Sequence, residues 1–275
     1  MAISINKVDA ETKNKIIEAY KNNMSLREIE KEFKVLRTTV SKFLEEQNIK
    51  KIKGNHYRKY FHDFDFFENI DTEEKAYWLG FMFADGYIVN HENRYGEDSF
   101  GLTLAEDSLD SIEKFKKSLH ATNPILYDNS KSIGQPLAKI VLTSQKTVND
   151  LIDKGCVKQK SLILQPPKKV PEKLLSHFIR GFFDGDGSLT KYNYNNYPSY
   201  NIEFTTTYEM AIWLRDIFGK GDVHKEKRRY FTWYYSIGGN RQVLDICNYM
   251  YDEATIWMNR KYARYQELLS KYNES

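Results

Sequence analysis

The sequence predicts an α+β protein in which a small all-α domain precedes two copies of one mixed unit. Two apolar segments, residues 77–86 and 178–187, share two small residues four positions apart and a terminal Asp-Gly. Alternating strands and amphipathic helices then follow each segment in the same order. Residues 1–47 show helical periodicity alone. These three observations predict a duplicated αββαββα fold behind a helical domain.

Residues 1–47 are predicted to form three helices. The first spans residues 12–22, where apolar side chains recur on one helix face. Ser25 and Glu28 have the spacing of a capping box, which predicts the start of the second helix. The third helix begins within residues 35–44. We expect these helices to pack together as one domain.

Positive charge is concentrated ahead of the two copies. The net charge is only +3, but residues 1–60 carry 14 Lys and Arg against 8 Asp and Glu, and the remainder carries 27 against 30. Residues 48–70 are predicted to be a linker. Its five basic residues are Lys50, Lys51, Lys53, Arg58 and Lys59. This distribution is typical of a segment that follows DNA phosphates, although a solvated tether would have the same charge.

The two copies are predicted to occupy residues 71–170 and 171–275. After its first helix, the first copy is predicted to have a strand at 99–105, a helix at 108–119, a strand at 138–143 and a helix from 146. The second copy is predicted to have strands at 200–206 and 231–237 and helices at 208–218 and 242–250. Polar residues between the apolar strand positions should face outward. They are Thr103, Lys139, Thr143, Asn201, Glu203, Thr205, Thr232, Tyr234 and Ser236.

Each repeated segment places one carboxylate at the end of a helix. The matched pairs, all 101 residues apart, are Gly80 and Gly181, Ala84 and Gly185, Asp85 and Asp186, and Gly86 and Gly187. Small residues four positions apart share one helix face and allow two backbones to approach closely. Packing these helices would bring Asp85 and Asp186 together, which is unfavourable without a cation because like charges repel. A hard ion such as Mg²⁺ binds carboxylate and phosphate oxygens together, so the pattern indicates metal-assisted phosphodiester hydrolysis.

Two other interpretations of these segments are open. Each helix could simply end in a solvated Asp, since Gly and Asp are common at turns; the matched second copy makes this less favourable. Asp184 could instead begin a calcium loop. That loop requires Gly at its sixth position and Glu at its twelfth, where this sequence has Leu189 and Asn195. The duplication therefore favours one site made from both copies.

Both segments resemble the LAGLIDADG motif of homing endonucleases, in the single-chain form with two motif copies. The resemblance covers about residues 72–268. It implies a pseudo-twofold saddle whose antiparallel sheets face DNA, and a metal held by Asp85 and Asp186. The first copy departs from the motif at Phe83, where the second has Asp184. That position is not the family's metal ligand, so the departure leaves the implied metal site intact.

A basic residue follows each motif at the same distance. Lys160 lies 75 residues after Asp85, and Lys261 lies 75 residues after Asp186. The resemblance implies that these lysines stand near the active site, where each can stabilise negative charge on the phosphate. The alternative is a pair of solvated surface lysines, which is the usual environment of Lys.

Other segments are predicted to contact DNA. The helices of residues 1–47 resemble the helix-turn-helix of resolvases and transposases. The resemblance implies that Arg37, Thr38, Thr39, Ser41 and Lys42 of the third helix face the major groove; a small helical bundle with a solvated basic face is the alternative. Residues 89–98 and 190–199 are predicted to be two long turns that read bases. The candidates there and on the strands are Asn93, Arg94, Lys139, Lys191, Asn193 and Asn195. A basic hairpin adds Lys225, Lys227, Arg228 and Arg229.

The combined prediction is a monomeric, Mg²⁺-dependent, site-specific double-strand DNA endonuclease of a mobile element, of the kind that serves intron homing. The resemblance implies a long, asymmetric target, because each half reads a different half-site. Two cysteines, Cys156 and Cys247, lie far apart and predict a reduced intracellular setting, cytoplasm or nucleoid. The sequence shows no secretion signal or membrane-spanning run. A catalytically inactive DNA-binding regulator and an intron RNA maturase are the alternative functions.

Overall fold

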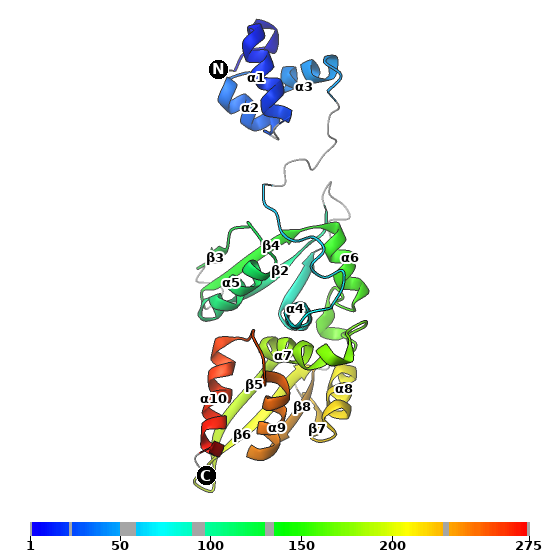
Figure 1. Cartoon of the computed structure of the whole chain (residues 1–275), viewed down its shortest axis with the longest axis vertical. Helices are drawn as coiled ribbons and strands as arrows, with labels where there is room; N and C mark the ends of the chain where they lie inside the picture. Colours follow the sequence, from blue (N-terminus) through cyan, green and yellow to red (C-terminus); the bar gives the residue numbers. More distant parts are fainter. Residues whose placement is uncertain are drawn as a thin grey trace. The chain divides into compact units, whose positions relative to one another are not determined.

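The computed structural model describes residues 2–21, 24–49, 59–89, 97–129, 135–227 and 231–273. The chain divides into two compact units, Met1–Tyr60 and Phe61–Ser275, which we call unit 1 and unit 2 (Figure 1). Within those described ranges, every helix is too short or too polar to cross a membrane.

Unit 1 contains the three helices that the sequence predicts. They are α1 (Ala10–Lys21), α2 (Leu26–Phe33) and α3 (Arg37–Glu46), preceded by a short 3₁₀ turn at Ile5–Lys7. The capping box is present, with the Glu28 amide donating to Ser25 Oγ at 3.1 Å and the Ser25 amide donating to Glu28 Oε2 at 2.9 Å. Apolar side chains from the turn and all three helices form the core. They are Ile5, Ile16, Tyr20, Ile29, Val35, Val40 and Leu44.

Unit 2 has the duplicated αββαββα order that the sequence predicts. The first half contains α4 (Glu73–Ala84), β1 (Gly86–Val89), β2 (Ser99–Ala105), α5 (Leu109–Ser118), β3 (Leu126–Asp128), β4 (Leu137–Thr143) and α6 (Gln145–Asp153). The second contains α7 (Leu175–Asp186), β5 (Gly187–Tyr194), β6 (Tyr197–Thr206), α8 (Tyr208–Phe218), β7 (Asp222–Lys225), β8 (Trp233–Gly238), α9 (Asn240–Tyr251) and α10 (Asn259–Asn273). Short 3₁₀ turns lie at Glu106–Ser108, Lys160–Leu162 and Glu172–Leu174.

Each half forms one four-stranded antiparallel sheet. The strand orders are β1-β2-β4-β3 and β5-β6-β8-β7, so the two halves have the same topology. Helices cover one face of each sheet, and the motif helices α4 and α7 lie side by side between the halves (Figure 1). The fold class is therefore α+β with a pseudo-twofold arrangement, as predicted.

The sequence pattern predicts the central strands of each sheet and misses the four edge strands β1, β3, β5 and β7. Strand β4 alternates buried and partly exposed residues, whereas β3 and β7 contain no buried residue. A strand without one-sided burial has no alternating apolar signal, so the edges are invisible to periodicity. The C-terminal helix α10 is missed as well.

The predicted long turn at residues 190–199 is wrong. These residues form the end of β5, a two-residue turn and the start of β6. Asn195 and Asn196 make the turn with φ of 49° and 65°. Two consecutive residues with positive φ are the signature of a type I′ hairpin turn, which Asn tolerates well. The Asn-rich stretch therefore marks a tight hairpin with long strands.

The motif helices pack backbone against backbone. A Cβ atom at Gly80 would lie 2.0 Å from the Phe178 carbonyl oxygen, and one at Gly181 would lie 1.9 Å from the Tyr77 carbonyl oxygen. Only glycine fits at these two positions, because a neighbouring main chain cannot move aside as a side chain can. The close approach predicted from the small-residue spacing is thus confirmed.

Candidate active site

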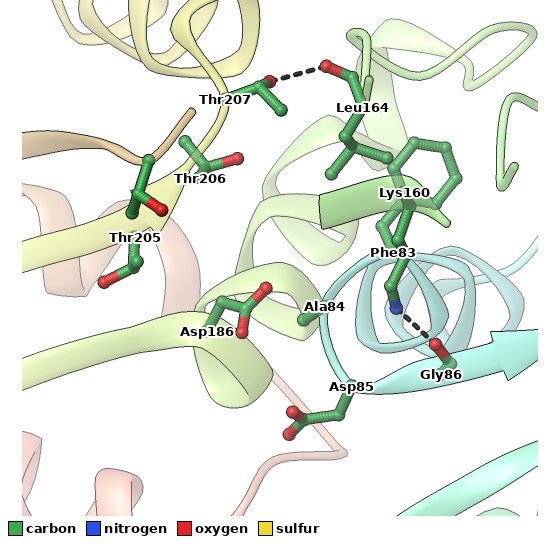
Figure 2. A pocket seen from close by; sticks show the side chains of 11 residues that line it. Phe83, Ala84, Asp85, Gly86, Lys160, Leu164, Asp186, Thr205, Thr206 and Thr207 are labelled. Carbon is green, nitrogen blue, oxygen red and sulfur yellow. Dashed lines mark hydrogen bonds between the residues drawn. The ribbon is translucent and has the colours of Figure 1, made fainter. Parts of the chain in front are cut away.

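The two motif aspartates lie at adjacent helix ends. Asp85 is the C-cap of α4, and Asp186 is the last residue of α7. Gly185 brings the two ends together, because a Cβ there would lie 2.2 Å from Ala84 Cβ and 3.3 Å from the Asp85 amide nitrogen. Both carboxylates border one pocket (Figure 2). The fold therefore brings together two acids that are 101 residues apart in the chain.

The pocket has a volume of about 400 Å³ and takes its walls from both halves. The first half contributes Phe83, Ala84, Asp85, Gly86, Lys160 and Leu164, and the second contributes Asp186, Thr205, Thr206, Thr207 and Thr232. Thr207 Oγ1 donates to the Leu164 carbonyl oxygen at 2.6 Å, which ties the chain between the halves to the start of α8 (Figure 2). The result is one composite, hydroxyl-lined site.

The two carboxylates of this site repel each other. Burial and, next, the negative charge of Asp85 raise the pKa of Asp186 to about 6. Burial also raises the pKa of Asp85, against the effect of Lys160 and Lys261. Asp186 is nevertheless an exposed residue, and Asp85 is half-buried. Water reaches the Asp186 carboxylate, and the repulsion from Asp85 acts on its pKa in the same direction as burial. A bound cation would relieve this repulsion.

The two predicted lysines hold the ends of the motif helices in matching ways. Lys160 Nζ donates to the carbonyl oxygens of Met82, at 2.8 Å, and Gly86. Lys261 Nζ donates to those of Phe183 and Gly187, both at 2.5 Å. Each acceptor in the second half lies 101 residues after its counterpart in the first. The repeat therefore extends to the hydrogen bonds, and each ammonium offsets the negative end of a helix.

Burial affects these lysines unequally. Lys261 is only 4% exposed, and burial lowers its pKa to about 8. Burial also lowers the pKa of Lys160, which is half-buried and forms part of the pocket wall. Neither lysine is a solvated surface residue, so the alternative interpretation from the sequence is wrong for both. Their positive charges lie close enough to both aspartates to lower the carboxylate pKa values.

We expect Asp186→Asn to stabilise the metal-free protein at neutral pH. An Asp in the unfolded chain has its ordinary pKa of 3.8, whereas the pKa of Asp186 in the folded state is about 6. Folding stability is therefore lost as pH rises between these values, and the loss is complete above pH 6. After a discount for solvent screening, the gain from Asn should be about 1 kcal/mol.

Thermal unfolding in a chelator should show this gain as a rise in Tm of about 2–4 °C at pH 7.5. The difference should shrink at about pH 4, where Asp186 is protonated in the folded state. Asp216→Asn is the matched control, since Asp216 is an exposed acid on α8. A Tm that stays constant or falls in Asp186→Asn at pH 7.5 would contradict the repulsion.

The strand register decides which predicted residues lie on the open faces of the sheets. Thr103 lies opposite Lys139 on the face away from the helices, and Thr143 is exposed there. Strand β6 and the neighbouring β8 present the predicted outward residues Asn201, Glu203, Thr205, Tyr234 and Ser236 on the corresponding face of the second sheet. These polar open faces confirm the predicted alternation.

Three other candidates lie on the helix-covered face. Lys191 is opposite the buried Tyr200 and donates to Glu267 of α10 at 2.5 Å. Asn193 has the same parity along β5. Lys225 is opposite Trp233, and its ammonium lies 5.9 Å from the centre of that ring. Because side chains alternate between faces, these three residues point away from the open faces, whereas Tyr192 and Tyr194 are exposed on the open face of β5.

In unit 1, Arg37, Thr38 and Lys42 are exposed on α3 and Ser41 is partly exposed. Thr39 Oγ1 instead accepts from the Ile5 amide at 3.1 Å and donates to the Leu36 carbonyl oxygen at 2.8 Å, so its hydroxyl is engaged within unit 1. Lys59, Asn195 and Lys227 are exposed. The predicted contacts Lys50, Lys51, Lys53, Arg58, Asn93, Arg94, Arg228 and Arg229 lie outside the described residues.

Two buried charges of α7 were not predicted. Arg180 is fully buried and donates to Glu73 Oε1 of α4 at 2.6 Å and to the Met250 carbonyl oxygen at 2.6 Å. Asp184 is fully buried and accepts three hydrogen bonds. The available signal was an Arg and an Asp inside the apolar stretch 178–184, where an unpaired charge is too costly to be retained.

Comparison of the sequence with known proteins gives a partial match. No family model matches the sequence. A curated relative, the replication factor C small subunit of Methanocaldococcus jannaschii, is 27% identical over 135 residues, which are 46% of this chain and 7% of that protein's length. This chain therefore spans only a small part of that relative.

Solved structures give a broader match. The LAGLIDADG homing endonuclease I-LtrWI bound to target DNA has a TM-score of 0.53 and 12% identity, over 75% of this chain and 92% of that one. I-SmaMI bound to uncleaved DNA in the presence of calcium ions has a TM-score of 0.51 and 14% identity, over 72% and 92%. This chain therefore has the duplicated fold of the LAGLIDADG homing endonucleases, with both motif helices in one polypeptide.

Proposed function

We propose that this protein is a site-specific DNA endonuclease that cuts both strands of a duplex by metal-assisted phosphodiester hydrolysis. The observation that carries the proposal is the position of Asp85 and Asp186, one from each half, at one open pocket between two sheets with polar open faces. The similar folds of I-SmaMI and I-LtrWI, both solved with DNA, support a duplex as the substrate.

The donor set fits a hard divalent cation, and we propose Mg²⁺. Among the described residues, His, Cys, Asp and Glu form no cluster of three or more that could enclose a metal. Asp85 and Asp186 would provide two carboxylates, and water and phosphate oxygens would complete the shell, a division that is usual for Mg²⁺. When bound, the cation would activate water and offset charge on the phosphate. The calcium ions present with I-SmaMI and uncleaved DNA support a divalent ion in that fold.

The chain's own residues position the reacting groups. Asp85 and Asp186 stand at the ends of helices in backbone contact, so the main chain holds both acids at one pocket. Lys160 and Lys261 keep positive charge beside the pocket while their hydrogen bonds fix the helix ends. This charge can stabilise the additional negative charge that develops on a phosphate during hydrolysis.

The two halves would read different parts of a long, asymmetric site. Their open faces carry different residues at matching places, such as Lys139 opposite Thr103 in one sheet and Tyr234 opposite Thr205 in the other. Both active-site acids are in one chain, so a monomer suffices. Unit 1 would extend the footprint through α3, and the basic residues of the linker would follow phosphates. We propose an intracellular role in the mobility of an intron or a similar element.

The decisive experiment selects cleaved molecules from a randomised duplex library with Mg²⁺, and repeats the selection in EDTA. We expect the Mg²⁺ arm to return one long asymmetric sequence and the EDTA arm to return none. Binding of a defined duplex without cleavage would contradict the proposal and favour an inactive regulator. A preference for structured intron RNA over any duplex would also contradict it and favour a maturase.

We further expect the exposed cations of α3 to strengthen binding. Replacing Arg37 and Lys42 together by Ala should raise the Kd for the selected duplex by about tenfold or more, and should reduce the dependence of Kd on salt. Lys15→Ala is the matched control, because Lys15 is an exposed cation on α1 of the same unit. Equal Kd values for the double variant and the control would argue against a DNA-binding role for α3.

A further inference from the structure

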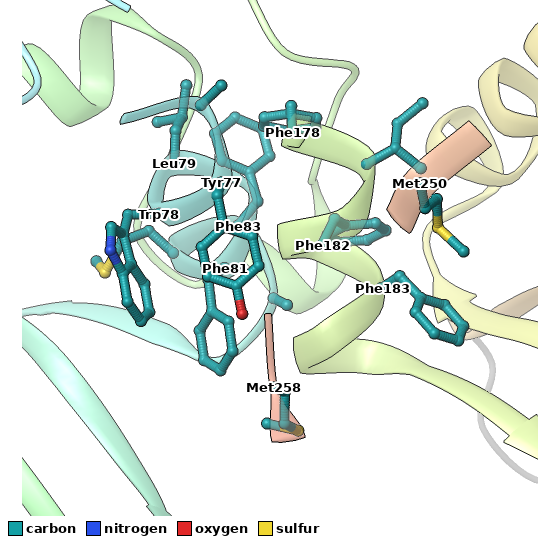
Figure 3. Close-up of a cluster of buried hydrophobic side chains, with 14 of the residues drawn as sticks. Tyr77, Trp78, Leu79, Phe81, Phe83, Phe178, Phe182, Phe183, Met250 and Met258 are labelled. Carbon is teal, nitrogen blue, oxygen red and sulfur yellow. The ribbon is translucent and has the colours of Figure 1, made fainter. Parts of the chain in front are cut away.

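Asp184 connects α7 to three other parts of unit 2. Its Oδ2 atom accepts from the Tyr77 hydroxyl of α4 at 2.9 Å and from the Met258 amide at 2.7 Å. Its Oδ1 atom accepts from the Tyr251 hydroxyl of α9 at 2.7 Å. The carboxylate is fully buried, so these three donors replace its hydration. Figure 3 shows Tyr77 on the helix beside α7, with Met258 near the end of α7.

The hydrogen bond from the Met258 amide to Asp184 affects the position of Lys261. Met258 precedes α10, and its carbonyl oxygen accepts from the Lys261 amide at 3.1 Å in the first turn of that helix. Asp184 thus holds the backbone at the start of α10. Lys261, on α10, in turn donates hydrogen bonds to the carbonyl oxygens of Phe183 and Gly187. The side chain of Asp184 and the ammonium of Lys261 therefore both link the end of α7 to the start of α10.

The first half cannot make this link at the matching position. Phe83 occupies the place of Asp184 and has no carboxylate, and its ring packs against Phe178 with 5.0 Å between ring centres. Lys160 begins a short 3₁₀ turn after Gln159, which has a φ of 52°. The two lysines therefore make matching bonds but are positioned by different means.

We propose that Asp184 is a positioning residue for Lys261, and through it for the cleavage of one DNA strand only. The effect on one DNA strand rests on the proposed endonuclease function, whereas the effect of Asp184 on the position of Lys261 does not. Each phosphate of a duplex cut by a pseudo-twofold enzyme lies nearer one lysine than the other. A substitution at Asp184 should therefore slow cleavage of the strand nearer Lys261 and leave cleavage of the strand nearer Lys160 unchanged.

The first test measures Lys261 directly and needs no substrate. Each lysine of the folded protein is labelled with a limiting amount of acetic anhydride and quantified by mass spectrometry. In Asp184→Asn, one acceptor oxygen is replaced by a donor, so the Met258 amide and both hydroxyls cannot all be satisfied. We expect labelling of Lys261 to rise several-fold while that of Lys160 stays constant. Unchanged labelling of Lys261 would overturn the proposal.

The second test measures each strand separately on a duplex labelled at both 5′ ends, at a temperature well below Tm. We expect Asp184→Asn to lower the rate for one strand by about 10- to 100-fold and to accumulate a nicked intermediate. Glu73→Gln is the matched control, because it weakens the Arg180 link between α4 and α7 and the bonds from Thr255, while Asp184 keeps its bond from Met258 at the start of α10. Equal slowing of both strands in Asp184→Asn would overturn strand selectivity.

Two further outcomes separate the possible failures. If Asp184→Asn does not fold, Tyr251→Phe removes one of the three donors and keeps the carboxylate, and a smaller effect on the same lysine and strand is expected. An unchanged Lys261 in that variant would overturn the proposal. If the wild-type protein cuts no duplex while Lys261 labelling responds to Asp184→Asn, the endonuclease function fails and the positioning role remains.

Discussion

Asp85→Asn or Asp186→Asn should abolish double-strand cleavage and leave DNA binding largely intact. Asn has nearly the shape of Asp but lacks the negative charge, so each variant should bind the cation poorly while α4 and α7 keep their positions. The expected loss in cleavage rate is at least about 100-fold. Binding should hold or strengthen slightly, because one negative charge facing the phosphates is gone.

The measurement pairs a plasmid cleavage assay with Mg²⁺ and an equilibrium binding assay in EDTA. Asp216→Asn is again the control, since it removes an exposed carboxylate from α8 outside the pocket wall. The assignment of Asp85 and Asp186 would be refuted by full cleavage in either variant. A variant that cuts a single strand would instead show that the two acids serve the two strands separately.

Gly181→Ala should destabilise unit 2 strongly. The new Cβ would lie 1.9 Å from the Tyr77 carbonyl oxygen and 2.8 Å from the carbonyl carbon, so α4 and α7 must move apart. Overpacking of this kind costs about 3 kcal/mol, which should lower Tm by roughly 6–12 °C. Cleavage should fall even below the new Tm, because the separated helices carry Asp85 and Asp186 away from each other.

Gly238→Ala is the matched control for that experiment. A Cβ at Gly238 meets only Asn201 Oδ1, at 3.6 Å, which is ordinary van der Waals contact. We therefore expect its Tm to stay close to that of the wild type by scanning calorimetry or circular dichroism. Similar losses in the two variants would mean that the helix contact is no tighter than an ordinary glycine site.

Local pattern is sufficient for much of this protein. Helix periodicity predicts α8 at its observed bounds, Tyr208–Phe218, and the alternation of apolar residues predicts β2 at Ser99–Ala105. Small-residue spacing predicts the contact between α4 and α7, because both helices carry it on one face. Each of these signals lies within about a dozen neighbouring residues, so no knowledge of distant partners is needed.

The hydrogen bonds of the buried polar residues of α7 cannot be predicted from local sequence pattern. Asp184 lies 107 residues from Tyr77 and 74 residues from Met258, its hydrogen-bond partners. Its role depends on groups that only the folded chain brings together, since a motif position gives no information about distant donors. The same holds for Lys191, whose place on the helix-covered face follows from its register opposite Tyr200.

The sequence by itself determined the duplication, the two motif helices and the pair Asp85 and Asp186, because each copy of the motif consists of neighbouring residues in the chain. The tertiary structure alone decided which strands form the edges, which polar residues lie on the open faces, and how Lys160 and Lys261 hold the helix ends. The physical reason is that burial and hydrogen bonding depend on distance in space, and α4, α7 and α10 become neighbours only when unit 2 folds.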